Sequence, residues 1–154
     1  MAAARGGFDA DWRESVGYLL RDTTRLMLRL TSARIAPHGM TMTQYFLLRQ
    51  LWEADGQTQR EIARDLDVPE PALATLLDAL EEAGFVTRER STTDRRRMHV
   101  HVTPEGKSLR EPLLATGESV IESMLAGCSQ RSIDDLRRML KKMKANLEET
   151  VAVS

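Results

Sequence analysis

The sequence has very little cysteine and no long apolar run. Cys128 is the only cysteine among 154 residues, so no disulfide can form within the chain. No apolar run approaches the roughly 20 residues that a helix needs to cross a membrane. Residues 1–8 are rich in alanine and glycine and lack the apolar segment of a signal peptide. We therefore expect a cytoplasmic protein in a reducing compartment, with no membrane partner.

The sequence also lacks the motifs of catalysis and of metal binding. It contains no glycine-rich phosphate loop, no paired-carboxylate motif and no pattern of nucleophile, base and orienting group. His99 and His101 alternate on one predicted strand, but no second cysteine or cluster of histidine and glutamate joins them. We therefore expect that the protein is not an enzyme and binds neither a metal nor a cofactor.

Apolar residues recur at spacings of three and four, which predicts a mainly helical chain. Helices are predicted over residues 9–36, 43–54, 59–66, 70–83, 104–127 and 132–151. Residues 85–90 and 98–102 alternate as two strands around a turn at 91–97. The predicted fold class is therefore mainly α with a small β-hairpin (α+β).

The order of these elements is that of a winged helix-turn-helix, whose second helix enters the major groove of DNA. The helix-turn-helix is TQREIARDLDVPEPALATLLDALEEAGFV, residues 58–86, and the hairpin after it is the wing. Arg95, Arg96 and Arg97 lie at the tip of that hairpin, directly after Asp94. A solvated hairpin tip can carry such a run, but arginine also suits a narrow minor groove.

Four blocks of sequence resemble the MarR family of bacterial transcriptional regulators. In chain order they are MTMTQYFLLRQL, TQREIARDLDV, LDALEEAGFVTRE and DRRRMHVHVTPEG. The last block is similar to the family's wing signature, Asp-x-Arg followed by a strand and Thr-x-x-Gly, with Asp94, Arg96, Thr103 and Gly106 at its positions. The resemblance implies a homodimeric repressor that occupies a pseudo-palindromic DNA operator. It also implies release by a small effector, often an aromatic or phenolic acid.

The resemblance divides the chain into three regions. An N-terminal dimerisation helix is expected over 1–36, a DNA-binding lobe over 40–106 and C-terminal dimerisation helices over 107–154. A helix with an apolar stripe cannot bury that stripe in so small a lobe, so a two-fold partner is expected. The predicted interface residues are Leu19, Ile133, Leu136, Leu140, Met143 and Leu147.

Individual roles at the two binding sites follow from these patterns. The resemblance implies that Arg96 enters the minor groove, while Asp94 orients an arginine. The other predicted DNA contacts are Gln59, Arg60, Ala72, Ala74, Thr75, Asp78, Arg88, Arg90, Arg95 and Arg97. An effector pocket between the dimer helices and the lobe is predicted from Trp12, Arg25, His38 and Tyr45. Family members that sense peroxides carry their cysteine on the first helix, so we expect a plain structural thiol at Cys128.

The predicted recognition helix departs from the family pattern. Family members usually carry arginine at the positions of Thr75 and Ala79, whereas residues 69–83 contain no basic residue. Residues 40–106 hold eight arginines and twelve acidic residues. One interpretation is DNA binding through alanine methyls, Thr75, helix amides and the wing arginines. The other is a ligand-binding or protein-interaction dimer of the same fold with weak or lost DNA binding.

Overall fold

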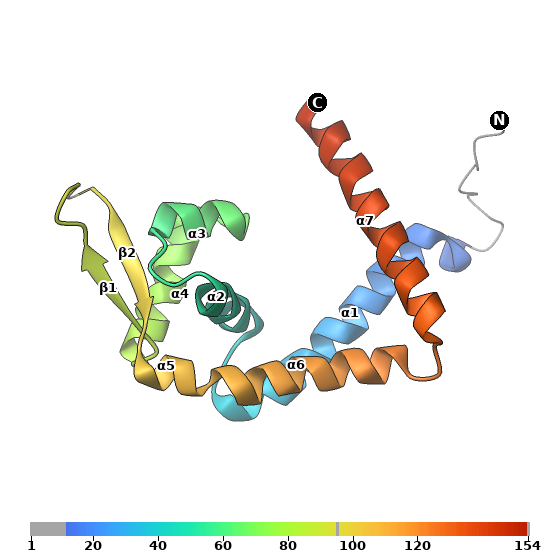
Figure 1. Cartoon of the computed structure of the whole chain (residues 1–154), viewed down its shortest axis with the longest axis horizontal. Coiled ribbons are helices and arrows are strands. Elements are labelled where there is room, and N and C mark those ends of the chain that lie inside the picture. The colour runs from blue at the N-terminus through green and yellow to red at the C-terminus, as the bar shows by residue number, and fades with distance from the viewer. Residues whose placement is uncertain (1–11, 95, 154) are drawn as a thin grey trace. The chain divides into compact units, whose positions relative to one another are not determined.

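The computed structural model describes residues 12–94 and 96–153. These residues form two compact units, the first ending at Val120 and the second beginning at Ile121 (Figure 1). The elements are η1 Trp12–Glu14, α1 Val16–Ile35, η2 Ala36–His38, α2 Met42–Glu53, α3 Gln59–Asp65, α4 Glu70–Glu82, β1 Val86–Arg90, β2 Met98–Val102, α5 Pro104–Ser108, α6 Arg110–Leu125 and α7 Gln130–Val153. The expected helical chain with one antiparallel hairpin is confirmed.

Two segments that were each predicted as one continuous helix are interrupted in the structure. The first, predicted over 9–36, is a short 3₁₀ turn followed by α1, because the Ser15 side chain accepts a hydrogen bond from Tyr18 N and caps a new helix. Residues 9–11 lie outside the described residues. The second, predicted over 104–127, is divided into α5 and α6. Pro112 cannot donate the helical hydrogen bond to the carbonyl of Ser108, where α5 ends.

The core of the first unit is formed by one side of each element from the end of α1 to the start of α6. A buried leucine or isoleucine contributes about 1.5–3 kcal/mol through removal of its surface from water. The fully buried side chains are Ile35, Leu47, Leu48, Leu51, Ile62, Leu73, Leu77, Leu80, Val86, Val100 and Leu113. This core fixes α3 and α4 against the hairpin, which sets the geometry of the predicted DNA-binding lobe.

The helix-turn-helix begins at a capping box. The backbone N–H and the hydroxyl of Thr58 both donate to Glu61 Oε2 at 2.8 Å, while Glu61 N donates to the Thr58 hydroxyl. The hydrogen bond from the Thr58 backbone N–H has the largest effect in lowering the pKa of Glu61, and the bond from the Thr58 hydroxyl lowers it further. Asp67 adopts a left-handed conformation with φ of 52° in the turn before α4, a conformation that aspartate tolerates. The predicted short helix, tight turn and second helix are all present.

The wing hairpin is anchored at its base by the turn between α2 and α3. Gly56 N donates to Val100 O at 3.0 Å, and Val100 N donates to Gln57 O at 2.9 Å. The Asp55 carboxylate accepts a hydrogen bond from Val102 N at 2.9 Å. Backbone of the α2–α3 turn therefore lies along the outer edge of β2.

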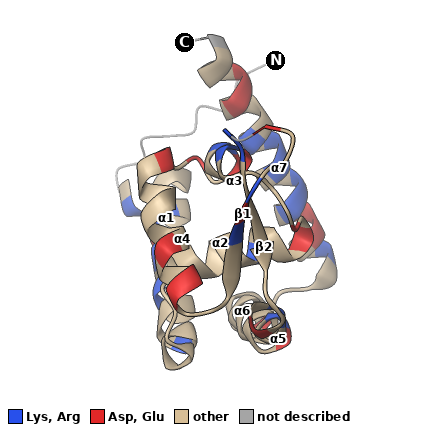
Figure 2. Ribbon diagram, turned by 90° about the vertical axis from the view of Figure 1, so that its left-hand side faces the viewer, with Lys and Arg blue, Asp and Glu red and all other residues tan. Residues whose placement is uncertain are grey.

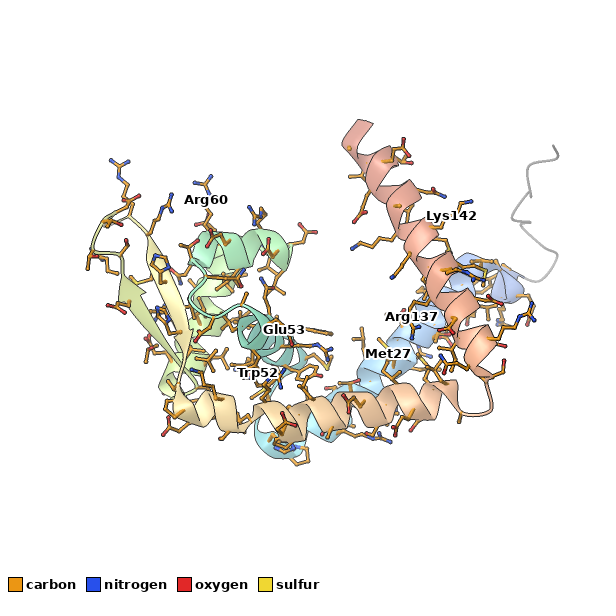
Figure 3. The ribbon with its side chains drawn as sticks, viewed as in Figure 1. Met27, Trp52, Glu53, Arg60, Arg137 and Lys142 are labelled. Carbon is orange, nitrogen blue, oxygen red and sulfur yellow. The ribbon has the colours of Figure 1, made fainter. Side chains whose placement is uncertain are left out.

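The Thr-x-x-Gly part of the wing signature has a structural explanation. The Thr103 hydroxyl caps α5 by accepting from Gly106 N at 3.0 Å, and it donates to Gly84 O at 2.7 Å. Trp52, labelled in Figure 3, donates from Nε1 to Gly106 O at 3.0 Å. Gly106 is buried and lies directly against the carbonyl of Phe85.

Replacement of Gly106 with alanine should lower the free energy of unfolding by at least about 1–3 kcal/mol, the usual cost of overpacking. A Cβ atom there would overlap the Phe85 carbonyl oxygen and lie 2.8 Å from Val102 Cγ1. Urea unfolding followed by circular dichroism measures the change. Gly17→Ala is the matched control, because nothing lies within 4 Å of its Cβ position and alanine favours a helix. Equal stability of the Gly106→Ala protein and the wild type would contradict this packing.

The second unit, residues 121–153 as described, is dominated by α7. Its polar sides carry ion pairs one turn apart, Arg137–Asp134 at 2.8 Å and Lys144–Glu148 at 3.4 Å. Its exposed apolar residues are Leu136, Met139, Leu140, Leu147 and Val151. Ile133 and Met143 are half-buried. Of the helices in the described part of the chain, none has the length and apolar character needed to cross a membrane.

The two compact units are defined by contacts within one chain. The C-terminal region was predicted to start at residue 107, whereas the structure groups residues up to Val120 with the lobe. The predicted regions were defined by dimerisation, which involves a second chain, so they stay predictions.

Candidate nucleic-acid interface

The recognition helix α4 buries one side and exposes the other. Leu73, Leu77 and Leu80 lie in the core, while Ala72, Thr75 and Asp78 are exposed. Ala74, a predicted DNA contact, is half-buried, as are Leu76 and Ala79. The Thr75 hydroxyl donates to Pro71 O at 3.3 Å, so its lone pairs stay available to accept from a base.

Proline limits the anion-binding capacity of the start of α4. Pro69 is the N-cap residue and provides no side-chain cap, while Pro71 has no N–H group. Leu73 N already donates to Pro69 O at 3.0 Å. The first turn therefore offers a phosphate only the amides of Glu70 and Ala72, and the exposed Glu70 carboxylate is adjacent to them.

The tip of the wing is shaped by Asp94. Its Oδ1 accepts from Arg96 N at 3.0 Å, its carbonyl accepts from Arg97 N at 2.9 Å, and its Oδ2 lies 3.5 Å from Arg97 Nε. The carboxylate therefore pairs with the side chain of Arg97 and fixes the backbone of Arg96, whose side chain is exposed. Arg95 lies outside the described residues. Entry of Arg96 into the minor groove stays a prediction.

Arg88 was predicted to contact DNA, but the structure gives it partners within the lobe. Its guanidinium bonds to Glu81 and Asp78 of α4. The lysine and arginine residues of the chain are blue in Figure 2 and the acidic residues red, so β1 is marked by its arginines and α4 by its carboxylates. Sequence patterns did not identify Glu81, because its partner lies on another element and the pair forms only after the chain folds.

Three exposed arginines of α3 and the wing have no ion pair within 4 Å among the described residues. Arg60 projects from α3 (Figure 3), Arg90 ends β1 and Arg96 lies at the wing tip. Gln59, at the start of α3, is half-buried. Arg64, by contrast, lies 2.9 Å from Asp65. Arg49 of α2 is also exposed, and its guanidinium donates to the Tyr45 hydroxyl. The accessible cations of the described lobe therefore lie on α2, α3 and the wing and not on α4.

The four residues predicted for an effector pocket have separate surroundings. Trp12 packs edge-to-face on Tyr18, with ring centroids 4.6 Å apart. Arg25 Nη2 lies 2.8 Å from Asp22 Oδ1 on the surface of α1, and His38 is exposed in η2.

Tyr45 alone of the four belongs to the core. It is buried in α2, and its hydroxyl accepts a hydrogen bond from Arg49 at 3.3 Å. Arg25 also lies nine residues after the start of α1, about 14 Å along the axis from the end near Trp12. The pocket stays a prediction.

Comparison with known proteins agrees with this architecture. A model of the MarR family matches residues 40–98. The chain is 30% identical over 128 residues to the HTH-type transcriptional repressor Rv2887 of Mycobacterium tuberculosis, a match that covers 83% of this chain and 92% of that protein. The chain belongs to the MarR family. It is therefore a member of a family of transcriptional regulators, which confirms the resemblance found in the sequence.

Solved structures of MarR-family proteins show the same fold. A MarR transcriptional regulator from Methanosarcina mazei matches with a TM-score of 0.81 at 23% identity, covering 88% of this chain and 97% of that one. A mutant of MarR from E. coli, crystallised in complex with operator DNA, matches with a TM-score of 0.75 at 25% identity. That match covers 82% of this chain and 91% of the E. coli chain.

Proposed function

We propose that this MarR-family chain is a DNA-binding repressor that acts as a homodimer on a pseudo-palindromic operator. The observation that carries the proposal is the exposed face of α4 beside a hairpin whose tip holds arginines. The M. tuberculosis relative named above is a transcriptional repressor, and the E. coli structure contains operator DNA, which supports the same role here.

Each element of the lobe has a place in this proposal. The two α4 helices of the dimer enter successive major grooves, about 34 Å apart. There the Thr75 hydroxyl accepts from a base edge, and the methyl of Ala72 contacts a thymine methyl. Arg60 and Arg90 contact phosphates, while Arg96 enters the flanking minor groove.

A small effector releases the operator in this proposal. An aromatic or phenolic acid bound beside α1 and α2 favours a dimer in which the two lobes no longer match the grooves. A coupling of about 1–3 kcal/mol suffices for such a switch. Trp12, Arg25, His38 and Tyr45 are the candidate contacts, with Arg25 as the partner of the carboxylate.

The test is a gel shift of the purified protein on the DNA upstream of its own gene, with unrelated DNA of equal length as the control. Preferential retardation of the upstream fragment supports the proposal. The alternative, a dimer of the same fold without an operator, is favoured by one observation, the lack of any basic residue from Pro69 to Ala83. Equal and weak binding of both fragments would select that alternative.

Operator binding should show a shallower salt dependence than binding by relatives with arginine in the recognition helix. Each neutralised phosphate contributes about −0.9 to the slope of log affinity against log salt concentration. Here the accessible cations lie outside α4, so fewer phosphates are neutralised. Fluorescence anisotropy at several salt concentrations measures the slope.

Arginine variants on α3 provide the matched comparison for this slope. Arg60→Ala should reduce its magnitude by about 0.9 per bound subunit, because Arg60 has no ion pair with any residue that the structure describes. Arg64→Ala should change it little, because Arg64 is already paired with Asp65. An equal reduction by both changes would contradict this assignment.

A further inference from the structure

Arg88 joins the wing to the recognition helix through a dense set of contacts. Its Nη2 lies 2.7 Å from Asp78 Oδ1 and 2.5 Å from Glu81 Oε2, and its Nε donates to Glu81 Oε2 at 2.9 Å. Its backbone N–H donates to Glu81 Oε1 at 3.0 Å. Both carboxylate oxygens of Glu81 are thus held by one residue of β1.

The hydrogen bonds between Arg88 and Glu81 stabilise the charged forms of both side chains. The hydrogen bond from the Arg88 side chain lowers the pKa of Glu81, and the bond to Glu81 raises the pKa of Arg88. Glu81 and Arg88 are therefore both ionised at neutral pH. The Arg88 side chain is 23% exposed, whereas that of Asp78 is 65% exposed and lies on the outward face of α4.

The C-terminal half of α4 needs such a cation. Carboxylates near the C-terminus of a helix oppose its dipole, and here Asp78, Glu81 and Glu82 all lie in the last turns. On a helix placed against DNA, these charges also oppose the phosphates. Arg88 is the described cation within 4 Å of Asp78 and Glu81.

We infer that Arg88 is the internal counter-ion of the recognition helix and not a phosphate contact. It braces α4 against β1 and cancels carboxylate charge that would repel DNA. A phosphate approaching its guanidinium would meet Asp78 and Glu81 within the same few ångströms. The inference rests on the proposed function, in which α4 enters the major groove.

Charge-neutral variants test this role. Arg88→Met should weaken operator binding about tenfold, the size of a coupled charge pair. Adding Asp78→Asn and Glu81→Gln to it should restore binding to within about threefold of wild type, because the carboxylates no longer need a counter-ion. The slope of log affinity against log salt should be the same for wild type and the triple variant.

Arg90→Met is the matched control on the same strand. Arg90 is exposed and has no ion pair among the described residues, so its loss should reduce the slope by about 0.9 per subunit. Asp78→Asn and Glu81→Gln should not rescue it. If Arg88→Met lowers the slope as Arg90→Met does and is not rescued, Arg88 contacts phosphate and the inference is overturned.

Two further measurements cover the remaining outcomes. If Arg88→Met does not fold, Asp78→Asn alone decides, since the inference expects it to strengthen operator binding and weaker binding would overturn it. A double-mutant cycle compares the free energies of unfolding in urea, without DNA, of wild type, Arg88→Met, Glu81→Gln and the variant that carries both changes. Additive changes in the free energy of unfolding would contradict a stabilising contact between Arg88 and Glu81, and non-additive changes support it. If the wild type binds no operator, the proposed function and the counter-ion role both fail, while the cycle still decides the brace.

Discussion

Leu140→Glu should convert the proposed dimer into monomers and lower its stability at the same time. In the structure Leu136, Leu140 and Leu147 of α7 are 39, 41 and 65% exposed, which is costly for apolar side chains unless a partner covers them. Burial of one leucine contributes about 1.5–3 kcal/mol, and two-fold symmetry counts each change twice. The free energy of dimerisation should therefore become less favourable by about 3–6 kcal/mol, and burial of an unpaired carboxylate adds a further cost.

Sedimentation equilibrium at micromolar concentrations measures this loss, and urea unfolding shows whether folding weakens with it. Lys142→Glu is the matched control, because Lys142 lies two residues further on, on roughly the opposite side of α7. It should leave the dimer intact. A wild-type protein that sediments as a stable monomer would refute the dimer itself.

Arg96→Ala should weaken operator binding by about 1–3 kcal/mol per half-site while leaving most of the base preference intact. An arginine in the minor groove responds to groove width and negative potential rather than to base identity. The exposed side chain of Arg96 and the Asp94 bond to its backbone N–H fit this role. Binding to a series of operator variants at one salt concentration measures both quantities.

Two companion variants separate the wing from the recognition helix. Thr75→Ala should cost little affinity but relax the preference at one or two base pairs per half-site. Asp94→Ala should resemble a weaker Arg96→Ala, because it loosens the turn that presents Arg96 without removing the charge. If Arg96→Ala binds every operator variant as tightly as wild type, the wing arginines are only solvated side chains and DNA binding loses its main support.

The sequence predicted the fold wherever short-range signals were strong. Apolar residues at helical spacing predicted α3 and α4, and the alternation on both sides of residues 91–97 predicted the hairpin. The errors arose from residues whose local signals were missed. Ser15 caps the start of a new helix. Pro112 has no N–H to donate to the Ser108 carbonyl, so the backbone hydrogen bonds do not continue from α5 into α6.

The candidate site was predicted less completely, because charge pairing depends on the folded arrangement. Every arginine of the lobe looks alike in the sequence, but Arg64 and Arg88 have carboxylate partners while Arg60 and Arg90 have none among the described residues. The partner of Arg88 lies seven residues earlier, on a helix that folds back against β1. No periodic pattern encodes that approach.

The two edges of the wing hairpin bear on its resistance to aggregation. An exposed strand edge is a template for another copy of the chain, and a two-stranded hairpin has two such edges. Here Gly56 and Gln57 bond to the backbone of Val100 on the outer edge of β2, while the Glu81 carboxylate occupies the N–H of Arg88 on β1. These backbone groups are therefore not free to pair with a second copy, which favours association through the helices over edge-to-edge stacking of hairpins.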